Sequence, residues 1–80
     1  MPHLPADIEA VRQSTQSWLN AVNPVGQSEQ DLISTAAAQG IEVRVIARDG
    51  ERFGLRADLR VNRINVEVVD GRVTRVDGVG

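Results

Sequence analysis

The C-terminal part of the chain constrains the fold most, because polar and β-branched residues alternate there in two runs separated by Asp70-Gly71. Side chains along a strand point to opposite faces in turn, and Asp-Gly is a preferred sequence for a tight hairpin turn. The pattern therefore predicts a β-hairpin over about residues 60–79. Its first strand is predicted to have an apolar face and a polar face, made respectively by Ile64, Val66 and Val68 and by Arg63, Asn65 and Glu67.

A helix is predicted between Ser28 and Gly40. Ser28 suits the N-cap position, and Asp31 three residues later gives a variant of the capping box. The alanine-rich sequence that follows favours a helix, and Gly40 suits the position just after its end. We expect three apolar residues of this helix to face the sheet: Leu32, Ile33 and Ala36.

The segment 41–47 alternates apolar and polar residues and predicts a half-buried strand directly after the helix. Its connection to the hairpin has two alternatives. Asp49-Gly50 can form a tight turn into an antiparallel strand over 51–59, or the segment can be an extended loop of about a dozen residues that makes the two main strands parallel. Gly54 and the small number of partners for an added strand favour the loop. Exposed loops commonly present recognition surfaces, so this one indicates binding rather than catalysis.

An N-terminal amphipathic helix is predicted from Pro5 to about Asn20, because apolar residues recur there at spacings of three and four. The sequence Asn23-Pro24-Val25-Gly26 ends it. We divide the chain into an N-terminal extension over 1–23 and a main domain over 24–80. The helix either docks a partner or covers the core. The positions in the apolar pattern are Ile8, Val11, Thr15, Trp18 or Leu19, and Val22.

Composition argues against an enzyme and against several kinds of partner. The chain has no cysteine, and its one histidine, His3, lies beside prolines near the N-terminus. We find no zinc, calcium or phosphate-binding motif, so no catalytic residue, metal or cofactor is predicted. Acidic and basic residues are interleaved, the net charge is -2, and only one Phe and one Trp could stack on bases, which argues against nucleic acid. No membrane-spanning stretch or export signal is present, so we expect a cytoplasmic protein unless the chain is a processed form.

Several short motifs in a fixed order resemble the potato inhibitor I family, the eglin-like serine protease inhibitors. The motifs are Trp18, the segment 24–29, the capped helix, the strand 41–47, the segment 59–64, Asp70-Gly71, the segment 73–76 and the final Val79-Gly80. Arg63-Ile64-Asn65 together with Gly71-Arg72-Val73 looks most similar to the elastase-inhibitor type and its bacterial relatives. The resemblance covers residues 18–80.

The resemblance implies an α+β domain with one main helix on a small mixed β-sheet and a long exposed loop between two parallel strands. It also implies inhibition of a subtilisin-like or chymotrypsin-like serine protease by that loop, which enters the active site and is hardly cleaved. The loop residues are then Phe53, Gly54, Leu55, Arg56, Ala57, Asp58 and Leu59. The residues expected to support the loop are Arg60, Arg63 and Asn65.

The loop is about two residues longer than is usual in the family, so its register stays open. Counting back from Arg63 makes Ala57 the primary specificity residue, whereas counting forward from Gly50 makes it Leu55, and an intermediate register makes it Arg56. The alternative function is a structural or protein-interaction module of the same fold without inhibitory activity. Such a module could be a monomer or a homodimer, formed through a strand edge or the N-terminal helix.

Overall fold

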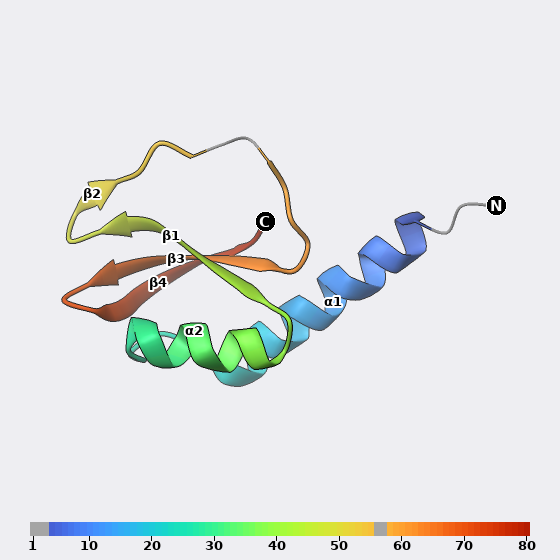
Figure 1. Ribbon diagram of the computed structural model, residues 1–80, viewed down its shortest axis with the longest axis horizontal. Helices are drawn as coiled ribbons and strands as arrows, with labels where there is room; N and C mark the ends of the chain where they lie inside the picture. Colours follow the sequence, from blue (N-terminus) through green and yellow to red (C-terminus); the bar gives the residue numbers. More distant parts are fainter. Residues whose placement is uncertain (1–3, 56–57) are drawn as a thin grey trace.

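The computed structural model describes residues 4–55 and 58–80, and within them two helices lie on one mixed four-stranded sheet (Figure 1). This is the predicted α+β architecture. The strand order is β2-β1-β3-β4. In chain order the elements are α1 (Leu4–Val22), α2 (Glu29–Ala38), β1 (Glu42–Arg48), β2 (Glu51–Arg52), β3 (Arg63–Val69) and β4 (Arg72–Val79).

Both ends of α2 are capped by the residues that the sequence indicates. The Ser28 hydroxyl accepts a hydrogen bond of 3.1 Å from the Asp31 amide. At the other end Gly40 has a φ of +72° and donates to Ala37 O, and the next amide donates to Ala36 O. These two bonds form a Schellman motif, which satisfies the last carbonyl groups of a helix. The caps fix the length of α2 and direct the chain into β1.

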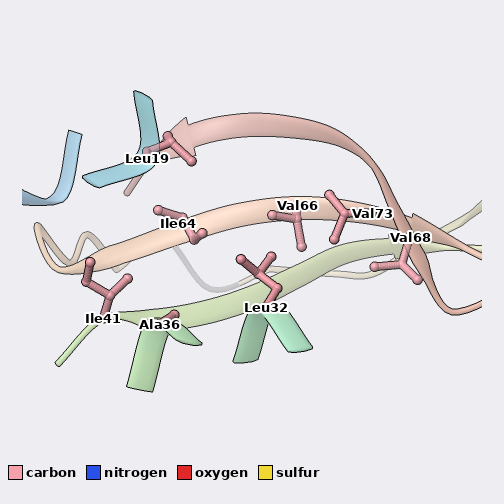
Figure 2. Packing of buried hydrophobic residues seen from close by; sticks show 8 residues of the cluster. All are labelled: Leu19, Leu32, Ala36, Ile41, Ile64, Val66, Val68 and Val73. Atoms are coloured by element: carbon pink, nitrogen blue, oxygen red, sulfur yellow. The ribbon is translucent and has the colours of Figure 1, made fainter. Parts of the chain in front are cut away.

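The core lies between the helices and one face of the sheet (Figure 2). Leu32 and Ala36 are fully buried, but Ile33 is 38% exposed, so its predicted place facing the sheet is wrong. A ten-residue helix on a small sheet buries only a narrow stripe, and Ile33 lies about 100° around the helix from Leu32. The buried cluster is Leu19, Leu32, Ala36, Ile41, Ile64, Val66, Val68 and Val73.

The connection between β1 and β3 contains parts of both predicted alternatives. Asp49 and Gly50 make the tight turn with φ of 52° and 86°, but β2 pairs with β1 at two positions only. A strand continuing to Leu59 does not form in the described part of the loop. The chain instead leaves the sheet, and β3 pairs with β1 in parallel, as the loop alternative predicts.

The β3–β4 hairpin turns at Asp70 and Gly71, which have φ of 51° and 76°. The segment before α2 extends the sheet locally, because Gly26 N donates to Val73 O at 2.8 Å and Val73 N donates to Gln27 O at 2.9 Å. We did not predict this pairing, and it fixes the start of α2 against the edge of β4.

The predicted N-terminal helix is confirmed as α1. Thr15 and Leu19, in its second half, are buried, and Leu19 belongs to the core cluster, whereas Ile8 and Val11 in its first half are exposed. Figure 1 shows that the first half extends beyond the sheet. Neither helix within residues 4–55 and 58–80 is both long and apolar enough to cross a membrane.

Candidate functional site

The segment 53–59, here called the loop, leaves the sheet after β2 and returns to it before β3 (Figure 1). Its first residue is held by β1, because Phe53 N donates to Ile46 O at 3.0 Å. Apolar side chains that a folded domain normally buries are exposed here, namely Phe53 at 39%, Leu55 at 47% and Leu59 at 89%. Leu59 is the most exposed of the large apolar residues in the described part of the chain, and all three side chains are accessible to another protein. The predicted site residues Arg56 and Ala57 lie outside the described residues.

Arg63, at the start of β3, is only 3% exposed although it is charged. Its Nη2 donates to Asp58 O at 2.8 Å and to Gly80 O at 2.8 Å, and its Nε donates to Gly80 O at 3.2 Å. Its Nη1 lies 3.4 Å from Asp58 Oδ2. The planar guanidinium has five N–H donors, so one side chain can bind two segments at once. Arg63 therefore joins the end of the loop to β3 and to the residue after β4.

Gly80 is fixed independently of the Arg63 side chain. Its amide donates to Arg63 O at 2.9 Å, and its oxygen also accepts from Arg60 N at 3.3 Å. The acceptor for the guanidinium is thus part of the backbone pairing at the end of the sheet. Because the acceptor is fixed, the orientation of Arg63 is fixed as well.

Arg44 and Asn65 are two further polar residues near the loop, and Arg44 contacts it. The β1–β3 register pairs Arg44 with Asn65, so both side chains point to one face. Asn65 Oδ1 accepts from Arg44 Nε at 2.7 Å, and Arg44 Nη1 lies 3.5 Å from Asp58 Oδ1. Asn65 was predicted from the sequence to support the loop, but Arg44 was not. The signal for Arg44 was its polar position in β1, which identifies a partner only once the parallel register is known.

Asp58 is the residue on which these contacts converge. Its carboxylate also lies 3.7 Å from Arg60 Nε. The hydrogen bond from Arg63 lowers the pKa of Asp58, partial burial opposes this, and the charges of Arg63 and Arg44 lower it further. The carboxylate is therefore ionised around neutral pH and attracts the arginines beside it.

The three predicted supports differ in their contacts. Arg63 contacts the loop directly, whereas Asn65 makes no hydrogen bond to the described loop residues and binds Arg44 instead. The Arg60 side chain is 58% exposed and lies between Glu42, at 3.6 Å, and Asp58. Exposed ion pairs of this kind contribute little to stability. The buried Arg63 is thus the main contact between the sheet and the described part of the loop.

A second charged cluster lies near the start of the loop, on the same face of the sheet. Arg52, the last residue of β2, lies 3.6 Å from Glu67 and 4.0 Å from Asp77. Arg75 also approaches both of these acidic residues. Charge pairs thus lie at both ends of the loop, but the arginines of this second cluster are exposed and their pairs contribute little to stability.

Among the described residues, no three His, Asp or Glu side chains lie close enough together to hold a metal ion. Comparison of the chain with protein-family models, with curated proteins and with solved structures found no match. Function is therefore inferred from the loop and from the side chains that hold it.

Proposed function

We propose that this protein inhibits a subtilisin-like or chymotrypsin-like serine protease by inserting the loop into the active-site cleft. The observation that carries the proposal is the buried Arg63, which binds both Asp58 in the loop and Gly80 beside it. A loop held in its bound shape before association loses little conformational entropy on binding. Support of the loop from the strand that follows it is also what the resemblance to potato inhibitor I proteins implies.

Contacts at both ends of the loop also give a physical reason why a bound protease would hydrolyse the loop slowly. Phe53 N is bonded to β1 before the central residues, and Asp58 is bonded to Arg63 after them. If the protease cuts between these points, both new ends stay attached to the sheet and near the catalytic groups. Reformation of the bond then competes with release of the product, so the chain occupies the cleft instead of leaving it.

The contacts of Asp58 favour one of the three registers left open by the sequence. Arg63 fixes the backbone oxygen of Asp58, and Ala57 precedes this residue directly. We therefore place the reactive bond between Ala57 and Asp58. A small primary specificity residue suits the shallow pocket of elastase-like enzymes better than the deep pockets of chymotrypsin-type or trypsin-type specificity.

Steady-state inhibition of subtilisin, elastase, chymotrypsin and trypsin by the purified chain tests the proposal. We expect the activity of elastase or subtilisin to fall as the concentration of the chain is raised. The activity should then stay low for the whole of the assay. An Ala57→Arg variant should also inhibit trypsin. The control variant Ala37→Arg, on the exposed face of α2, should inhibit the same proteases as the wild type. Rapid cleavage within 48–59 without inhibition of any of the four enzymes would refute the proposal.

A further inference from the structure

The two carboxylate oxygens of Asp58 contact arginines from two different strands. Oδ1 lies 3.5 Å from Arg44 Nη1 on β1, and Oδ2 lies 3.4 Å from Arg63 Nη1 on β3. A contact to one oxygen leaves the carboxylate free to rotate about its last bond, whereas contacts to both oxygens restrict that rotation. Asp58 is thus held from the strand before the loop as well as from the strand after it.

Arg44 is itself oriented by a neighbour in the sheet. Its Nε donates to Asn65 Oδ1 at 2.7 Å, a short distance for such a bond. Because Nε is bound to Asn65, the other edge of the guanidinium, which carries Nη1, faces Asp58. The Arg44 side chain is 21% exposed, in contrast to 58% for Arg60, which approaches the same carboxylate. An oriented and largely covered arginine loses less freedom on pairing than an exposed one.

We propose that Arg44 is a positioning residue of the loop, and that Asn65 acts through Arg44 rather than on the loop itself. The resemblance to known inhibitors implies supports on the strand after the loop, so a support on β1 is an additional feature of this chain. The effect on inhibition rests on the proposed function. The effect on the conformation of the loop does not.

The inference predicts that Arg44→Gln loosens the loop without unfolding the domain. We expect the Arg60 amide, which donates to Gly80 O beside Arg63, to exchange with solvent about 3–10-fold faster. The pKa of Asp58, followed by carboxyl NMR, should rise part of the way toward its ordinary value, because the hydrogen bond from Arg63 that chiefly lowers it remains, whereas the charge of Arg44, which also lowers it, is removed. Amides of the core strand β3, such as Val66, should keep their protection.

Two matched variants separate positioning from a general charge effect. Arg60→Gln removes a charge near the same carboxylate, but from an exposed side chain, and should raise the pKa of Asp58 less than Arg44→Gln does. Exchanging the register partners, as Arg44→Asn with Asn65→Arg, keeps one guanidinium and one amide on the same face. This double variant should recover most of the protection that Arg44→Gln loses.

The proposal is overturned if Arg44→Gln leaves the Arg60 amide and the Asp58 titration as in the wild type, or shifts the Asp58 titration no more than Arg60→Gln does. Inhibition assays on the same variants give a separate result. If the wild type inhibits none of the four proteases, the proposed function fails, whereas the exchange and titration data still decide the role of Arg44.

Discussion

Arg63 Nη2 donates a hydrogen bond of 2.8 Å to the backbone oxygen of Asp58, five residues earlier in the chain. The bond closes the end of the loop onto the first residue of β3. Because the same guanidinium also bonds to Gly80, three separate segments of the chain meet at one buried side chain. The position of Asp58 at the end of the loop therefore depends on the buried Arg63.

Arg63→Lys should destabilise the domain by about 1–3 kcal/mol, since an ammonium group keeps the charge but cannot bond to both backbone oxygens in one plane. Urea denaturation measures the effect, and limited proteolysis should show faster cutting within 53–59. Arg72→Lys is the matched control, because Arg72 is exposed although it also donates to a backbone oxygen, that of Gly26. Equal stabilities of the two variants would contradict this role of Arg63.

Acid should release the loop before it unfolds the core. The folded-state pKa of Asp58 lies below its unfolded value, chiefly because of the hydrogen bond from Arg63. Its contribution is therefore complete above the unfolded pKa of about 4 and is lost as the pH falls through the lower folded-state value. Hydrogen exchange of the Arg60 amide, corrected for intrinsic rates, should accelerate below about pH 4. Asp58→Asn should abolish that pH dependence, and a persistent dependence in this variant would assign it to another group.

Gly54→Ala should be neutral or should stabilise the domain by about 0.4–1 kcal/mol, because it lowers the entropy of the unfolded chain. Gly54 has no positive φ, and a Cβ there would meet no atom of residues 4–55 and 58–80 within 4 Å. A stiffer loop should also inhibit more tightly. Gly50→Ala is the contrasting variant, since its φ of +86° strains any side chain, at a cost of about 1 kcal/mol. Thermal unfolding of the two variants tests whether Gly54→Ala is the more stable one. If Gly54→Ala is less stable than the wild type, the loop needs glycine at this position.

Leu32→Ala should cost about 2–5 kcal/mol, because Leu32 is fully buried in the core that supports the sheet. Ile33→Ala, next to it on α2, should change stability by no more than about 0.5 kcal/mol, since Ile33 is partly exposed. Denaturation midpoints of the two variants test the packing of α2. Similar losses would mean that α2 is rotated about its axis from the position described.

The elements with local signals could be predicted from the sequence. The Asp70-Gly71 hairpin and the caps of α2 depend on residues a few positions apart, and period-two alternation placed Val66 in the core. Features that depend on distant partners could not be derived in this way. The side chain that meets Asn65 follows from the parallel register of β1 and β3, and the place of Ile33 follows from how α2 is rotated on the sheet.

The primary specificity residue of the loop could not be predicted from the sequence for a similar reason. Leu55, Arg56 and Ala57 were equally acceptable when positions were counted along the chain. The proposal of Ala57 relies on the contacts between Asp58 and Arg63, which depend on where the loop returns to the sheet. Local sequence therefore indicates that a loop is present, whereas the side chains that hold its end are known only from tertiary contacts.

The most direct measurement is mass spectrometry of the chain during prolonged incubation with elastase, with residual protease activity recorded in parallel. We predict a chain that stays largely intact while the protease is inhibited, with slow cutting at the single bond between Ala57 and Asp58. Rapid cutting at several bonds of the loop, with full protease activity throughout, would contradict the claim that Arg63 holds the loop in an inhibitory shape.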